Sequence, residues 1–301
     1  MTRRPRLTLA CATVLVACAG EMDTDGADPV TAQSHLGGCI LREPLGSIPP
    51  ELYTVTDVRR TDDHPPFTKF LTSRGLMLAA REDASDDFMR LVGVAIAEIF
   101  PRDAALDLAA QEEIISNHHR YRALIPVPIG DDLSFIDEGS VGWRQTVAAS
   151  SICDIIMQNV PRGQVMEVVE HILHYVTDIG LHYTFPDEWG IHDTSAVAQA
   201  MEKAIELGYY NVEQYVDEED EALRRVLVQE FAYWVISTAW NLQEVYGPVW
   251  EEEWQITDRA DLQEKLPELY GVYERTVARV MVAPSLETLR RFGPTRAEEG
   301  R

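Results

Sequence analysis

Residues 164–182 carry two patterns at the helical repeat, and together these patterns constrain how the segment can pack. At about 100° per residue, an α-helix gathers the apolar residues of this segment on one side: Val165, Val168, Val169, Ile172, Leu173, Val176 and Ile179. Polar residues fall within roughly 80° of one another on the other side: His171, His174, Asp178 and His182. The polar side has two interpretations, a row of metal ligands on one element or the face that an amphipathic helix shows to water.

Most of the remaining chain also predicts helices. Ser85 precedes one apolar-periodic segment and Gly208 follows another, as expected for an N-cap and a C-terminal stop. Residues 219–245 predict a long helix. Pro267 predicts a kink or a break within residues 259–282, because proline lacks the amide hydrogen that a helix interior requires.

Strand signals are confined to a few short segments. Residues 76–80 and 123–129 are apolar and predict a small sheet. We therefore expect a mainly α fold with a small sheet, in a single domain over residues 39–294. Residues 295–301 predict a frayed tail.

The first 17 residues have the composition of a signal peptide. Arginines precede an apolar run at residues 7–17, which at 11 residues is shorter than the roughly 20 that span a bilayer. The run ends in residues 15–18, Leu-Val-Ala-Cys, which resemble a bacterial lipobox. This resemblance implies that Cys18 is lipidated and becomes the first mature residue, whereas plain secretion is the alternative.

The residues after Cys18 predict where the domain is held. Ala19 follows Cys18 in place of aspartate, and the usual sorting pattern then implies the outer membrane. Residues 18–38 are small and acidic without periodicity, which predicts a tether. We expect an exported protein that is attached by a lipid to the bacterial cell envelope.

The net charge limits the classes of partner that the chain can bind, and the cysteines raise the question of a disulfide. The formal net charge is −24, so the chain repels phosphate backbones and nucleic acid is excluded as an expected partner. In an oxidising compartment Cys39 and Cys153 can form a disulfide. The sequence gives no distance between them, so a disulfide and two free thiols stay equally open.

Glu230 lies in the most apolar helix that the sequence predicts. Residues 226–240 are apolar on nearly every side, so a carboxylate there is costly unless it is paired, protonated or bound to a metal. One interpretation is a structural ion pair or hydrogen bond with an arginine or a tyrosine. The other is a metal ligand that arrives from a second helix.

These segments resemble those of secreted bacterial zinc metallopeptidases of the gluzincin type. That family has His-Glu-x-x-His on one helix and a glutamate ligand on a later helix, and residues 168–174 match the first motif with the pair reversed to Glu170-His171. Residues 66–76 are similar to an upstream helix and strand of some members, and residues 230–234 to the later helix. The resemblance implies a zincin-like fold, a bound zinc ion and a peptide substrate.

The reversed pair leaves two arrangements of ligands open. In one, Glu170 and His174 bind zinc at the i, i+4 spacing while His171 acts as the base. In the other, His171 and His174 bind zinc and Glu170 acts on water, with a further ligand from Glu230, Asp178 or His182. We favour the second arrangement because two imidazoles suit zinc better than one.

The sequence thus predicts a lipid-anchored zinc metallopeptidase that hydrolyses peptide bonds with a metal-activated water. Two alternatives belong to other classes. One is a catalytically inactive relative that serves as a surface scaffold, since fold resemblance does not establish activity. The other is a non-catalytic metal-binding lipoprotein with a closed site.

Overall fold

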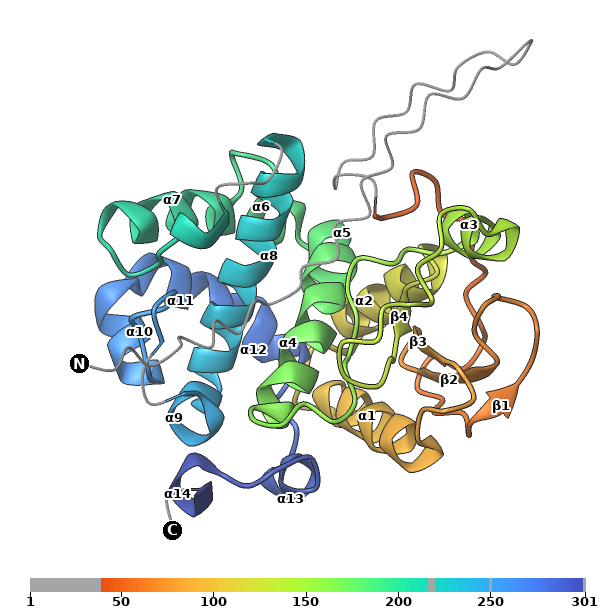
Figure 1. Ribbon diagram of the computed structural model, residues 1–301. Helices are drawn as coiled ribbons and strands as arrows, with labels where there is room; N and C mark the ends of the chain where they lie inside the picture. Colours follow the sequence, from red (N-terminus) through yellow and green to blue (C-terminus); the bar gives the residue numbers. More distant parts are fainter. Residues whose placement is uncertain (1–38, 216–219, 249–250, 300–301) are drawn as a thin grey trace.

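Helices form most of the structure, with one small sheet at the side (Figure 1). The computed structural model describes residues 39–215, 220–248 and 251–299. The sheet lies with helices α1 (Asp86–Ile99) and α2 (Leu108–Arg120) at one end of the molecule (Figure 1). At the other end lie α7 (Ala196–Glu206), α10 (Arg259–Lys265) and α11 (Pro267–Arg275), and α4 (Gln164–Tyr175) and α8 (Asp220–Ala239) lie between the two ends (Figure 1). The predicted mainly α class with a small sheet is therefore confirmed.

The sheet has the strand order β1-β2-β3-β4. Its strands are β1 (Arg59–Arg60), β2 (Lys69–Ser73), β3 (Leu76–Ala80) and β4 (Leu124–Pro126). The first three pair antiparallel, and β3 pairs parallel with β4. Both predicted strand segments are thus in the sheet.

The helix that the family resemblance implied before β3 is wrong, because β2 occupies that place. Arg74 and Gly75 both have positive φ angles, 48° and 79°, which make the tight turn between β2 and β3. Lys69 is buried in β2, where its ammonium donates to Ala84 O at 2.6 Å and to Asp86 Oδ1 at 2.8 Å. These bonds compensate for burying the charge, so the polar residue does not prevent a strand.

The helices next to the sheet begin at side-chain caps. They are α1 (Asp86–Ile99), α2 (Leu108–Arg120) and α3 (Val141–Ala149). Ser85 accepts from Phe88 N at 3.3 Å, as the sequence predicted for the start of α1. The start of α3, which the sequence analysis did not identify, has the same cap at Ser140.

The histidine-bearing segment is a helix with a change of repeat in its middle. It consists of α4 (Gln164–Tyr175), the π-helix η1 (Val176–Leu181) and α5 (His182–Thr184), followed by α6 (Pro186–Trp189). The helix packed against α4 is α8 (Asp220–Ala239). The single helix predicted over residues 219–245 is wrong in one respect, because Asn241 with φ of 60° separates α8 from α9 (Leu242–Tyr246).

The other helices pack around α8 and along the C-terminal part of the chain. They are α7 (Ala196–Glu206), the 3-10 helix η2 (Glu213–Tyr215), α10 (Arg259–Lys265), α11 (Pro267–Arg275), α12 (Val277–Val280), α13 (Leu286–Arg290) and α14 (Arg296–Glu299). The break predicted at Pro267 is confirmed, since α10 ends before it and α11 begins with it. Residues 296–299, in the segment where we expected a frayed tail, form α14.

The buried apolar side chains form one large cluster and one small one. The large cluster joins α1, α4, α8 and α11, and the small one packs Trp143 of α3 against Phe67 and Phe70. None of the helices in the described residues has both the length and the hydropathy to cross a bilayer. The predicted signal peptide, Cys18 and the tether lie outside the described residues.

Candidate metal site

The histidine side of α4 is buried, so the interpretation of a polar face in water is wrong. The exposed fractions are 4 % for His171, 0 % for His174, 1 % for Asp178 and 9 % for His182. The chain near Asp154 and helix α8 both contact this side of α4. Buried imidazoles and carboxylates require partners, and the site is defined by which partners they have.

His174 lies at the centre of the polar cluster, between two carboxylates. Its Nδ1 donates to Asp154 Oδ2 at 2.5 Å, because a carboxylate only accepts. Its Nε2 lies 3.4 Å from Glu230 Oε2 but has no hydrogen-bond partner. The ring is thus oriented by one nitrogen while the other nitrogen lacks a hydrogen bond.

Glu170, His174 and Glu230 place one donor atom each within 4.8 Å of one another. Glu170 also lines a cavity of about 480 Å³ whose wall includes Tyr233, Trp234, Tyr246 and Phe292. Glu230 forms its ion pair with His174, and among the described residues no arginine or tyrosine is hydrogen-bonded to it. Two members of this donor group, Glu170 and His174, are the pair of ligands that their i, i+4 spacing in the sequence predicts.

His171 belongs to the other side of the cluster, with Asp154. Its Nδ1 donates to Glu167 O at 2.6 Å, and its Nε2 lies 3.4 Å from Asp154 Oδ1. Donor atoms of Asp154, His171 and His174 also lie within 4.8 Å of one another, and all three residues are buried. The structure therefore brings Glu230 together with Glu170 and His174, and it groups His171 with Asp154.

The charges around the site change the proton affinities of its members. Burial lowers the pKa of His171, but Asp154, Glu167 and Glu170 outweigh burial and raise it to about 9. Burial also opposes charge on His174, yet Glu230 and Asp154 raise its pKa well above the ordinary value. Burial and repulsion from Glu230 raise the pKa of Glu170 to about 8. Without a bound cation, the cluster therefore holds protons at neutral pH.

Asp178 and His182, two predicted ligands, have other partners. Asp178 Oδ2 accepts from Arg225 Nη1 at 3.0 Å, and burial raises the pKa of Asp178 to about 6 although Arg225 lowers it. His182 Nδ1 accepts from Ile191 N at 3.3 Å. The π-helix η1 lies between His174 and His182, and its wider turns rotate the later residues away from the direction that a regular helix gives.

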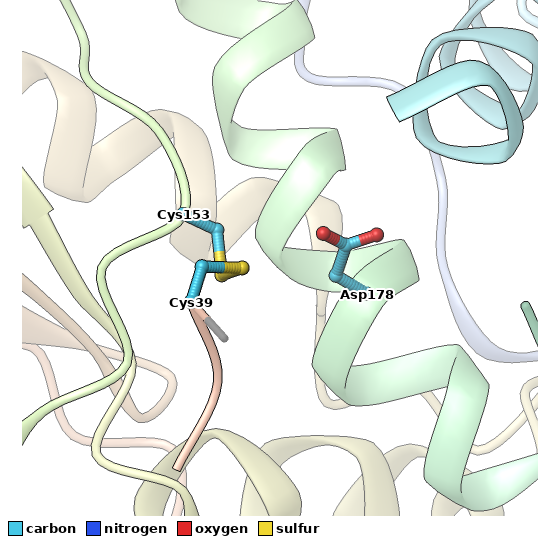
Figure 2. Close-up of side chains that lie close together, drawn as sticks. All are labelled: Cys39, Cys153 and Asp178. Atoms are coloured by element: carbon cyan, nitrogen blue, oxygen red, sulfur yellow. A yellow bond between two sulfur atoms is a disulfide. The ribbon is translucent and has the colours of Figure 1, made fainter. Parts of the chain in front are cut away.

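Cys39 and Cys153 form a disulfide, which the sequence left open (Figure 2). Figure 2 shows the disulfide facing the turn that carries Asp178. The two sulfurs and an Asp178 oxygen are close enough to resemble a metal-ligand group. Because the sulfurs are bonded to each other, they are not thiolate ligands in this state.

Asp154 is the residue of this site that the sequence analysis missed. It follows the disulfide cysteine, and Tyr175 Oη accepts from the amides of Cys153 and Asp154 at 3.0 and 3.1 Å. Ile155 N and Gln229 Nε2 also donate to its carboxylate, at 2.8 and 3.3 Å. One signal was present in the sequence, since Asp154 is an acidic residue within the apolar run of residues 152–156.

Comparison of the chain with models of protein families, with curated proteins and with solved structures found no match. The resemblance to gluzincin peptidases therefore rests on the motifs alone.

Proposed function

We propose that this protein binds a zinc ion through Glu170, His174 and Glu230 and hydrolyses peptide bonds. The observation that carries the proposal is the arrangement of His174. Asp154 holds its Nδ1, and its Nε2 lacks a hydrogen bond and lies 3.4 Å from Glu230 Oε2, while one donor atom of Glu170 completes a group within 4.8 Å. A carboxylate that orients a histidine in this way is the usual second shell of a metal-binding imidazole.

The cavity beside Glu170 supports a catalytic rather than a closed site. Catalytic zinc sites have three protein ligands and an open position, whereas structural sites use four. Glu170 reaches the cavity, while His174 and Glu230 lie behind it. Zinc bound there would lower the pKa of a water molecule and polarise a carbonyl group.

The chain's own residues have separate roles in this proposal. Tyr233, Trp234, Tyr246 and Phe292 offer aromatic surface to the side chains of a peptide in the cavity. With Glu170 as a ligand, His171 is the residue of the motif left for proton transfer, and because it does not line the cavity its proton would pass through a water molecule. A protonated imidazole can give its proton to the leaving amine.

Metal content is the test of the site. We expect about one zinc per chain after purification of residues 20–301 without chelator, as a three-ligand site with one open position requires. Glu230→Gln should lower the zinc content, and the exposed Glu264→Gln on α10 should not. Release of amines from unfolded protein substrates should depend on zinc and be inhibited by chelator. Full zinc binding by Glu230→Gln would exclude Glu230 as a ligand.

A second candidate is an inactive scaffold in which a proton takes the place of the metal. The observation that favours it is the raised pKa of His174, because a protonated ring between Asp154 and Glu230 compensates the charge of both carboxylates. This candidate predicts no bound metal and a melting temperature that chelator does not change.

A third candidate is a non-catalytic metal site on the other side of the ring. Asp154, His171 and His174 are all buried and form the second donor group. None of these three residues lines the cavity beside Glu170, so a metal bound there would lie away from a substrate in that cavity. It predicts stoichiometric metal that remains in Glu230→Gln and is lost in His171→Ala.

We also propose export and attachment to a membrane through a lipid on Cys18. The disulfide between Cys39 and Cys153 supports export, because such bonds persist in oxidising compartments. Incorporation of labelled palmitate into the full chain, lost in Cys18→Ser, is the expected result. Labelling that persists in Cys18→Ser would overturn the assignment of this cysteine.

A further inference from the structure

A row of buried polar side chains on α8 connects Asp178 with Asp154. Arg225 and Gln229 are 4 % and 2 % exposed. The Nη1 of Arg225 donates to Asp178 Oδ2 at 3.0 Å and also to Gln229 Oε1. Gln229 Nε2 in turn donates to Asp154 Oδ2 at 3.3 Å, the oxygen that accepts from His174.

The chemistry of the groups fixes the direction of every hydrogen bond in this row. A guanidinium only donates, so the oxygen of the Gln229 amide faces Arg225. The amide nitrogen then faces Asp154, where a carboxylate can accept. Asp154 therefore accepts from both Gln229 and His174, and His174 must donate from Nδ1.

We propose that Arg225 and Gln229 are positioning residues of the candidate metal site, acting on His174 through Asp154. By keeping Asp154 as an acceptor, they keep the hydrogen of His174 on Nδ1. In the neutral ring, the lone pair is then on Nε2, the nitrogen 3.4 Å from Glu230 Oε2. The link to metal binding rests on the proposed function, whereas the hydrogen bond of Nδ1 does not.

The spacing on α8 explains how one helix acts on both nitrogens of the ring. Arg225 and Gln229 are four residues apart, so they share a helix face. Glu230 is the next residue and reaches Nε2 of His174, while Gln229 reaches the carboxylate that holds Nδ1. Helix α8 thus supplies the carboxylate at Nε2 of His174 and supports the carboxylate at Nδ1.

The test removes the donor of Gln229 without removing its bulk. Gln229→Met keeps a side chain of similar length and leaves the ion pair of Arg225 with Asp178 in place. Gln229→Glu keeps an acceptor for Arg225 but puts a carboxylate against Asp154. Gln111→Met is the matched control, because Gln111 is a buried glutamine on α2 whose bonds go to Tyr53, Pro101 and Val280.

Two quantities are measured in each folded variant. Zinc affinity, by competition with a chromophoric chelator, should fall roughly tenfold in Gln229→Met and further in Gln229→Glu, with no change in Gln111→Met. The downfield Nδ1–H proton signal of His174, by nitrogen-edited NMR of the metal-free protein, should shift or broaden in both Gln229 variants. A role in stability alone would leave this signal unchanged.

The outcomes separate this inference from the proposed function. If the unmodified protein binds no zinc, the proposed function fails, but the His174 signal still decides whether Gln229 positions the ring. An unchanged signal together with unchanged zinc affinity in either folded Gln229 variant would overturn the inference. If Gln229→Met does not fold, Gln229→Glu supplies the same comparison, since it retains the bond to Arg225.

Discussion

Two buried histidines, His118 on α2 and His174 on α4, share one local arrangement and differ in everything around it. Both are 0 % exposed, and in both Nδ1 donates to an oxygen while Nε2 has no hydrogen-bond partner. The oxygen belongs to the backbone of Arg74 for His118 and to the carboxylate of Asp154 for His174. The ring of His118 lies against Phe100, whereas His174 lies between carboxylates.

The difference shows that an unsatisfied imidazole nitrogen is not enough to indicate a metal site. Burial lowers the pKa of His118 to about 4, so its ring stays neutral, while Glu230 and Asp154 raise the pKa of His174. The Nε2 of His118 faces the α-carbon of Gly180, where a β-carbon would lie 2.8 Å away. His118 thus fills space in the core, whereas His174 is grouped with further donor residues, of which Glu170 lines a cavity.

The largest expected effect separates the two histidines by metal binding. His174→Ala removes the ligand that both proposed metal-ligand groups share, so stoichiometric zinc should be lost, an affinity decrease of at least ~100-fold. His118→Ala should retain zinc, because no carboxylate in the described part of the chain pairs with that ring. Metal content by mass spectrometry measures both. Equal zinc content in the two variants would contradict the assignment of the metal site to His174 rather than to His118.

The second effect is on the pH dependence of folding, and it belongs to His118. Its pKa is about 4 in the folded protein and about 6.5 in an unfolded chain, so the folded state favours the neutral ring. This contribution is complete above pH ~6.5 and is lost as the pH falls towards 4, at a cost of about 3 kcal/mol. Urea unfolding of the wild type and of His118→Gln, compared between pH 7 and pH 4, should show this difference. Parallel pH profiles would contradict it.

The sequence predicted the elements better than it predicted the site, and the π-helix explains much of the gap. The cap at Ser85 and the break at Pro267 depend on local chemistry, so they could be found without the fold. Asp178 and His182 were placed by extending a regular helix, and η1 changes the repeat between His174 and His182. The sequence of these residues has no local pattern from which a π-helix could be predicted.

Asp154 and α3 were missed for a different reason. Asp154 lies 20 residues before His174, in a segment without helical or strand periodicity, and only the fold brings the two together. The start of α3 at Ser140 follows residues 130–139, in which acidic and apolar residues alternate without a clear periodic signal. Pairing between distant segments is set by tertiary packing rather than by local propensity.

A smaller effect tests the support behind His174. Tyr175→Phe removes a hydroxyl that accepts from the amides of Cys153 and Asp154 and lies 2.7 Å from Leu124 O. Leaving these buried groups without partners should cost about 2 kcal/mol of unfolding free energy. Zinc affinity should fall as well, because Asp154 is less well held. A loss of stability without any change in zinc affinity would show that the hydroxyl supports the fold alone.

The smallest expected effect is that of Gly180→Ala, a substitution next to His118. The added β-carbon would lie 2.7 Å from Ile114 Cγ2 and 2.8 Å from His118 Nε2, so buried side chains must move. Such overpacking costs typically 1–3 kcal/mol, while alanine gains about 1 kcal/mol over glycine within a helix. The net expectation is a destabilisation of about 1 kcal/mol with unchanged zinc affinity, measured by urea unfolding and by zinc titration. Because Gly180 lies in η1, a change in zinc affinity would show that the π-helix couples the two histidines, and they would no longer be independent.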